Sequence, residues 1–199
     1  YIKNYSKIKN KDRYIAFLPG SRLGEVKSLI KYFKLASEYL ESISSPLEIF
    51  IPTLPHLYDS IIFLTKNWNK KPIIIKDQKI SDKLFFQTSL ALVCSGTASL
   101  EAALLRTPVV VAYKTSWLTY IVVKPMLKIS HFALPNLLAG KKVLPELIQR
   151  KVTALNLFNA FNKLDQQDYQ NCLKAFDKIH SELKSEGPDS AANCIAEML

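Results

Sequence analysis

Short runs of apolar residues alternate with segments of helical periodicity through the first 112 residues of this 199-residue chain. The runs at 14–18, 47–51, 72–75, 90–94 and 109–111 are predicted strands, and several of them are apolar at every position. A strand that is apolar on both faces is typical of a parallel sheet covered by helices on both sides. The sequence therefore predicts an α/β fold with a doubly wound, Rossmann-like parallel sheet.

Helices are expected between and after these strands. A helix over 23–40 is predicted by apolar residues that recur every three or four positions, with lysines and glutamates on the other side. Shorter helices are predicted at 56–68 and 81–87, the second with Ser81 as its N-cap. Later in the chain the pattern is mainly helical, and the expected helices are 117–128, 144–150, 153–162, 166–184 and 189–198.

The chain is expected to contain one main domain with two terminal segments. Residues 1–12, rich in Lys and Asn, are predicted to be a linker or a frayed lead-in, and residues 13–186 to form the sheet domain. Residues 187–199 are expected to form a helical C-terminal tail. The most apolar long stretch is too short, and too interrupted by two lysines and a proline, to span a bilayer. A soluble or peripheral protein is therefore expected.

Charge is unevenly distributed along the chain, which has a formal net charge of +10. Residues 1–34 carry nine Lys and Arg against two Asp and Glu, whereas residues 165–199 carry three against seven. The basic front suits the phosphates of nucleic acid, of anionic lipid or of a phosphorylated substrate, or is a solvated surface. Nucleic acid is not an expected partner, because the sequence offers neither base-stacking aromatics on an exposed strand nor a recognition helix.

Cysteine and histidine are too scattered to suggest a metal site. The three cysteines and three histidines lack metal-ligand spacing, so neither a metal nor another cofactor is expected. An odd number of widely separated cysteines argues against a disulfide framework and fits a reducing compartment.

Two turns follow strands that are expected to be neighbours. In a sheet of order 3-2-1-4-5, the turns after 14–18 and 90–94 flank the point where strand order reverses, which is where such sheets bind ligands. The first turn contains Gly20 for a sharp bend, Ser21 as a helix N-cap and Arg22, whose guanidinium can bind a phosphate through two hydrogen bonds. The alternative is a tight turn with a solvated arginine.

The second turn has the sequence Ser95-Gly96-Thr97-Ala98-Ser99-Leu100-Glu101. It places small residues, hydroxyls and bare backbone N–H groups at a helix start, whose positive end suits an anion or a sugar. Glu101 is expected in the first helical turn, where its carboxylate can accept two neighbouring ribose hydroxyls. The turn therefore indicates a nucleotide-sugar site, and the alternative is tight packing of a helix on the sheet.

Further polar residues occur in apolar surroundings. Asn136 needs hydrogen-bond partners if it is buried. Pro145 and Glu146 suit the first turn of the expected helix at 144–150.

Aromatic and basic residues interleave over 113–132, which is typical of a membrane interface or a lipid-bearing substrate, or of a core helix with exposed lysines.

Taken together, these segments resemble the C-terminal half of the lipid-A-disaccharide synthase family. The motifs cover about residues 14–150, and their order and spacing follow the family's. The matching blocks are Leu-Pro-Gly-Ser-Arg-x-x-Glu-Val at 18–26, Ser-Gly-Thr-Ala-Ser-Leu-Glu-Ala-Ala-Leu at 95–104, Pro-Val-Val-Val-Ala-Tyr-Lys at 108–114, Leu-Thr-Tyr at 118–120, and Leu-Pro-Asn-Leu-Leu-Ala-Gly at 134–140 with Pro-Glu-Leu-Ile-Gln at 145–149.

The resemblance implies a two-domain glycosyltransferase of the GT-B type, of which this chain is the donor half. Its tail at 187–199 would pack on a missing N-terminal half. Such an enzyme transfers 2,3-diacylglucosamine from UDP to 2,3-diacylglucosamine 1-phosphate, giving lipid A disaccharide 1-phosphate and UDP. The implied partners are the UDP-diacylglucosamine donor, the acylated glucosamine phosphate acceptor and the cytoplasmic membrane surface. The expected location is the bacterial cytoplasm, peripheral to the inner membrane.

The resemblance also implies roles for individual residues. Arg22 and Asn136 would be catalytic, with Arg22 neutralising phosphate charge as UDP leaves. The general base is expected in the N-terminal half, because nothing places Asp12 or Glu25 at an acceptor hydroxyl. The implied UDP-sugar-binding residues are Gly20, Ser21, Ser95, Gly96, Thr97, Ser99, Glu101, Glu146 and Gln149.

Two other functions stay open at this point. Another UDP-sugar-binding GT-B protein, such as a 2-epimerase or a peptidoglycan glycosyltransferase, would share the fold, although the block at 134–140 argues against it. A non-catalytic, membrane-associated remnant would bind liposomes without affinity for UDP.

Overall fold

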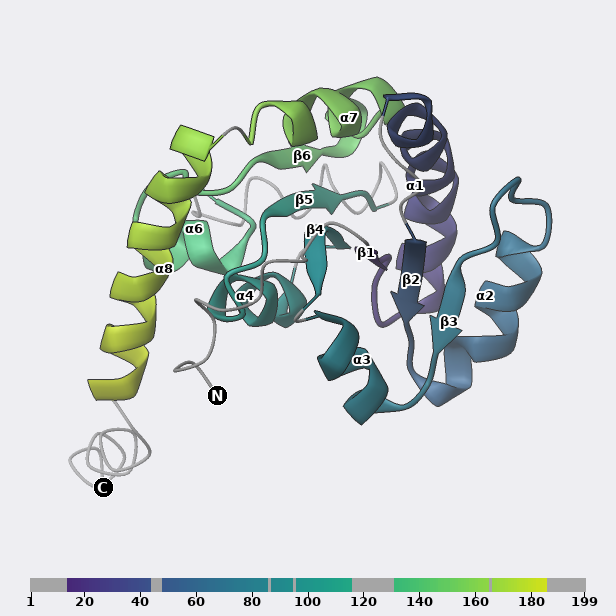
Figure 1. Ribbon diagram of the computed structural model, residues 1–199, viewed down its shortest axis with the longest axis horizontal. Helices are drawn as coiled ribbons and strands as arrows, with labels where there is room; N and C mark the ends of the chain where they lie inside the picture. The colour runs from purple at the N-terminus through teal and green to yellow at the C-terminus, as the bar shows by residue number, and fades with distance from the viewer. Residues whose placement is uncertain are drawn as a thin grey trace.

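A parallel sheet of six strands, covered by helices on both faces, forms the core of the protein in the computed structural model (Figure 1). The structure describes residues 14–43, 48–85, 87–94, 96–115, 131–164 and 166–185. The predictions for 1–12, 117–128 and 187–199, and the predicted site residue Ser95, lie outside these residues.

The strands are arranged in the order β3-β2-β1-β4-β5-β6. The predicted order 3-2-1-4-5 and the doubly wound α/β fold are confirmed, and β6 adds an edge strand beside β5. All six strands run parallel, and they are β1 (Tyr14–Leu18), β2 (Glu48–Pro52), β3 (Ile73–Ile75), β4 (Thr88–Cys94), β5 (Val109–Tyr113) and β6 (Glu146–Ile148).

The helices form one layer on each face of the sheet. The first layer contains α1 (Leu23–Ile43), α2 (Tyr58–Thr65) and α7 (Ala154–Asn162), with α7 beside α1 (Figure 1). The second layer contains α3 (Gln78–Phe85), α4 (Thr97–Leu104), α6 (Leu134–Leu138) and α8 (Gln166–Ser185). Within the described ranges, no helix is long and apolar enough to cross a membrane.

Successive side chains of each strand enter two different cores. In β1, Ile15 and Phe17 pack with the helices of the first layer, whereas Ala16 packs with those of the second. All three are at most 1% exposed, because both faces of the sheet are covered. This two-sided burial explains why the strands are continuous apolar runs rather than alternating ones.

The predicted helix over 144–150 is wrong. The chain there forms β6, followed by a 3₁₀ turn, η3 (Gln149–Lys151). The backbone of β6 pairs with β5, and the N–H of Val111 donates to the carbonyl of Pro145 at 2.9 Å. Pro145 directly precedes the strand, where its missing N–H costs no sheet hydrogen bond. Pairing with β5 has therefore overridden a local pattern that favours a helix.

Two helix starts also differ from their predictions. α3 begins at Gln78, where the Asp77 carboxylate accepts the N–H of Ile80 at 3.0 Å, and Ser81 lies inside the helix. α4 begins at Thr97, so Glu101 lies in the second helical turn rather than the first. The carboxylate of Glu101 is therefore one turn away from the positive end of the helix.

Candidate functional site

A cavity of about 320 Å³ lies at the carboxyl ends of four neighbouring strands. Leu18, Pro52, Ile75 and Cys94, the last residues of β1, β2, β3 and β4, all line it. The chain runs outward from β1 to β3 on one side and from β4 to β6 on the other. The cavity thus lies over the point where strand order reverses, the usual ligand position in sheets of this kind.

The turn between β1 and α1 forms one wall of the cavity and requires a glycine. Gly20 has a φ of +124°, which L side chains rarely adopt. A Cβ at Gly20 would also lie 2.5 Å from Oε2 of Glu25. Glycine is therefore needed here both for the backbone conformation and for the close approach of the Glu25 carboxylate.

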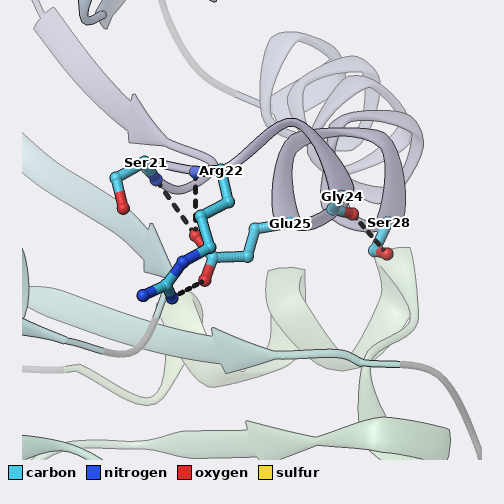
Figure 2. A network of polar contacts seen from close by, with 5 residues as sticks. All are labelled: Ser21, Arg22, Gly24, Glu25 and Ser28. Atoms are coloured by element: carbon cyan, nitrogen blue, oxygen red, sulfur yellow. Dashed lines mark hydrogen bonds and ion pairs between the residues drawn. The ribbon is translucent and has the colours of Figure 1, made fainter.

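Glu25 holds this turn in place, as Figure 2 shows. Its Oε2 accepts the backbone N–H groups of Ser21 at 3.0 Å and Arg22 at 3.2 Å, and its Oε1 accepts Nη1 of Arg22 at 3.0 Å. Glu25 thus caps the start of α1, where the sequence predicts Ser21 as the cap. These N–H groups are taken, whereas the Arg22 side chain is 82% exposed and lines the cavity.

The N-terminus of α4 forms the opposite wall. Its N-cap is Gly96, with a φ of 137°, and no side chain in the described part of the chain makes a capping hydrogen bond there. Gly96, Thr97 and Ala98 all line the cavity. An uncapped helix N-terminus presents backbone N–H groups and the positive end of the helix dipole. Backbone donors for an anion therefore come from α4 rather than from α1.

Glu101 is the available carboxylate of the cavity. Glu101 is exposed and lines the cavity, and its carboxylate makes no hydrogen bond or ion pair with the residues that the structure describes. By contrast, Glu25 is held by the first turn, and Asp77 and Asp82 each accept a hydrogen bond from α3. Across the described ranges, no group of three or more His, Cys, Asp or Glu side chains is placed to hold a metal ion.

One side of the cavity was not predicted from the sequence. Thr53 and Leu54 follow β2, Lys76 and Asp77 follow β3, and all four line the cavity together with Phe85 of α3. Ligands of such sheets bind beyond the carboxyl ends of the strands, and this applies to the turns after β2 and β3 as much as to those after β1 and β4. In the order 3-2-1-4, the carboxyl ends of β2 and β3 lie at the same edge of the sheet.

The structure brings together part of the predicted site. Ser99 is fully buried and does not line the cavity. Its hydroxyl donates to the carbonyl of Gly96 at 2.7 Å and so stabilises the N-terminal turn of α4. The predicted residues that do line the cavity are Gly20, Ser21, Arg22, Gly96, Thr97 and Glu101.

Asn136, which is fully buried, and Glu146, which is partly buried, form a separate cluster that does not line this cavity. The Oδ1 of Asn136 accepts the N–H groups of Val143 and Leu144, each at 2.7 Å. Its Nδ2 donates to the carbonyl of Leu144 at 3.0 Å and to Oε1 of Glu146 at 2.6 Å. The Glu146 carboxylate also accepts the N–H of Ala133 at 2.9 Å. The two side chains together tie α6 to β6.

Gln149 lies at the carboxyl end of β6, on the same edge of the sheet as the cavity but not in its lining. Its φ of 51° is uncommon for a residue with a side chain. Its Oε1 accepts the N–H of Thr115 at 3.2 Å, and its carbonyl accepts Nζ of Lys114 at 3.2 Å. Gln149 therefore links the ends of β5 and β6.

Solved structures that share this fold include glycosyltransferases and a UDP-GlcNAc 2-epimerase. MurG of Acinetobacter baumannii has a TM-score of 0.52 at 16% identity, over 87% of this chain and 47% of MurG. A TarM variant of S. aureus, solved in complex with UDP, has a TM-score of 0.57 at 13% identity, over 85% of this chain and 32% of TarM. The fold is therefore that of one Rossmann-like half of a GT-B glycosyltransferase.

The family model for lipid-A-disaccharide synthetase matches residues 1–199. The chain therefore belongs to this family. The lipid-A-disaccharide synthase of Saccharophagus degradans is 34% identical over 193 residues, which are 96% of this chain and 50% of the relative. That of Acinetobacter baylyi is 36% identical over 160 residues, 76% of this chain and 40% of the relative. The chain spans about half the length of the curated relatives that it matches.

Proposed function

We propose that this chain is the donor half of a glycosyltransferase and that its cavity binds the UDP end of UDP-2,3-diacylglucosamine. One observation carries the proposal: Arg22, the uncapped N-terminus of α4 and the available carboxylate of Glu101 line the same cavity of about 320 Å³. A cation and backbone N–H groups suit a diphosphate, and a carboxylate suits ribose hydroxyls. A nucleoside diphosphate has its diphosphate next to the ribose hydroxyls, which matches the arrangement of these protein groups.

The positions of these groups define an orientation for the nucleotide. The diphosphate lies between Arg22 and the first N–H groups of α4. Glu101 follows Thr97 by one helical turn, about 6 Å along the axis, which suits the ribose next to the diphosphate. The uracil ring then extends toward Phe85 of α3, the aromatic side chain in the cavity lining.

The proposed reaction joins two acylated sugars. The 6-hydroxyl of 2,3-diacylglucosamine 1-phosphate attacks C1 of the donor sugar, and the bond from C1 to the oxygen of UDP breaks. Arg22 and the N-terminus of α4 stabilise the negative charge that develops on the diphosphate. The hydroxyl proton goes to a base in the N-terminal half of the enzyme, because Glu25 is already bound to the first turn.

The proposal extends to partners and location. Donor and acceptor both carry acyl chains, so the enzyme would work at the cytoplasmic surface of the bacterial inner membrane, together with an N-terminal half. Family membership favours this substrate pair over those of a 2-epimerase or a peptidoglycan glycosyltransferase. If the chain were instead a membrane-associated remnant, the titration described next would detect no binding of UDP.

Isothermal titration of UDP into the chain tests the proposed site. We expect a Kd of about 10–1000 µM, since one half of a two-sided site binds weakly. Arg22→Ala and Glu101→Gln should each weaken binding about tenfold or more, by losing a charge that contacts the diphosphate or the ribose.

Matched controls make the same charge changes elsewhere. Lys27→Ala and Asp59→Asn alter exposed side chains that do not line the cavity, and they should leave UDP affinity unchanged. The proposal fails if the folded wild-type chain does not bind UDP, or if the controls weaken binding as much as the site variants do.

A further inference from the structure

A second and larger cavity, of about 1020 Å³, lies beside the edge strand β6. Its walls are α7, α8 and the loop at 138–145 that leads into β6. It shares no lining residue with the cavity proposed for UDP. That loop precedes β6, whereas the UDP cavity lies beyond the carboxyl ends of the strands, so the two cavities are separate sites.

The rim of this cavity, formed by the exposed lysines that line it, is strongly basic. Among the described residues, Glu146 is the one acidic residue of the lining, and its carboxylate is bound to Asn136 and to backbone N–H groups. Apart from Lys178, the lysines of the rim make no ion pair or hydrogen bond through their ammonium groups with the residues that the structure describes. The exposed lysines that line the cavity are Lys141, Lys142, Lys163, Lys174 and Lys178.

The interior of the cavity is partly apolar. Leu138, which is 45% exposed, and the partly buried Val143, Leu147 and Leu164 form its solvent-accessible apolar floor, with the buried Leu144 and Ile179 beneath them. Asn156 and Asn159 of α7 add amide groups that can donate or accept hydrogen bonds. The cavity thus combines a cationic rim with an apolar floor, a pattern that matches an amphiphilic anion.

We propose that this lysine-rimmed cavity binds a phosphate-bearing ligand whose remaining part is apolar. The ammonium groups of Lys141, Lys142, Lys163 and Lys174 lie around one opening and repel each other, and a doubly charged phosphate ester relieves this repulsion while accepting several hydrogen bonds. The apolar part of the ligand removes the floor of the cavity from water. The volume is that of a site for a ligand of several hundred daltons.

The phosphate can belong to a soluble ester or to a lipid headgroup in a bilayer, and the test separates these sources. Dodecyl phosphate, kept below its micelle concentration, is titrated into the ¹⁵N-labelled chain with saturating UDP present to fill the other cavity. Dodecyl phosphate is the soluble apolar ester, phosphatidylglycerol vesicles supply the headgroup, and glucose 1-phosphate is the phosphate ester with a polar remainder. Backbone amide shifts at 138–146 and 171–179 report binding in the lysine-rimmed cavity.

Two double variants with equal charge loss provide the comparison. Lys142→Gln/Lys174→Gln removes two lysines of the rim, whereas Lys27→Gln/Lys71→Gln removes two exposed lysines that line neither cavity. We expect the rim variant to bind dodecyl phosphate at least tenfold more weakly, and the control to bind it like the wild type. Neither double variant alters a residue that lines the UDP cavity, so the comparison of their affinities for dodecyl phosphate holds whether or not the chain binds UDP.

The outcomes either support or overturn the inference. Shifts with dodecyl phosphate and with the vesicles identify a lipid headgroup, and shifts with dodecyl phosphate but not with the vesicles identify a soluble apolar ester. Glucose 1-phosphate should bind at least tenfold more weakly than dodecyl phosphate, and equally tight binding would overturn the apolar part of the proposal. Equal weakening by both double variants would show general charge attraction instead of a site. Equally tight binding of uncharged dodecyl maltoside, or no shifts with any phosphate, would also overturn the proposal.

Discussion

Replacing Asn136 with leucine is expected to lower the free energy of unfolding by about 3–5 kcal/mol. Asn136 is fully buried, and its side chain makes four hydrogen bonds at 2.6–3.0 Å. Leucine fills a similar volume but leaves backbone groups of Val143 and Leu144 without this partner. It also removes a donor from the partly buried carboxylate of Glu146, which is the more costly loss.

Denaturant unfolding followed by circular dichroism measures this change in stability. Asn159→Leu is the matched control, because Asn159 is exposed on α7, and we expect it to change stability by less than about 0.5 kcal/mol. A loss below about 1 kcal/mol in Asn136→Leu would show that the cluster contributes little. UDP affinity of the folded variant is a second readout: unchanged affinity supports a structural role, and lost affinity supports the role implied by the family resemblance.

Replacing Gly20 with alanine is expected to destabilise the chain by about 2–4 kcal/mol and to weaken UDP binding at least tenfold. The added Cβ would lie 2.5 Å from Oε2 and 2.6 Å from Cβ of Glu25, at a φ of +124° that alanine rarely adopts. Glu25 must therefore move. Its movement releases the N–H groups of the turn and the guanidinium of Arg22, which then has no fixed position at the cavity.

Two other glycines separate backbone strain from steric collision. Gly96 has a φ of +137° with no atom within 4 Å of an added Cβ, so Gly96→Ala introduces strain alone and should destabilise by about 1 kcal/mol. Gly24 lies in α1 with open space around it, and Gly24→Ala should stabilise the chain by about 0.5–1 kcal/mol. Equal denaturation midpoints for the variants at Gly20 and Gly96 would refute the collision with Glu25.

β1, β2, β4 and β5 could be predicted because each is a compact apolar run that is buried on both faces, and β3 could be predicted because it is also a continuous apolar run, although Ile73 is 43% exposed. β6 could not, since Pro145 followed by Glu146 is a common helix start, and only pairing with β5 makes the segment extended. For strands that are buried on both faces, the local run of apolar residues is enough to predict the strand. At the edge of the sheet the structure is decided by a neighbour that is distant in the sequence.

The two turns of the candidate site were predictable from strand order, but the contacts within them were not. Serine is a common N-cap, yet at α1 the longer side chain of Glu25 reaches back to the N–H groups, and at α3 Asp77 does so in place of Ser81. Asn136 was expected to need partners once buried. That Glu146 is one of them depends on where α6 lies against β6, which no local pattern encodes.

The pairing of β1 with β4 has a consequence for how the chain folds. The hydroxyl of Ser89 donates to the carbonyl of Tyr14 at 3.1 Å across 75 positions of sequence. Contacts of such separation must close a long loop and tend to form slowly. One wall of the cavity of about 320 Å³ follows β1 and the other follows β4, so the two walls meet only once this pairing is complete. A ligand of the cavity therefore stabilises only the finished sheet, and it shifts the whole cooperative unfolding transition to higher denaturant concentration.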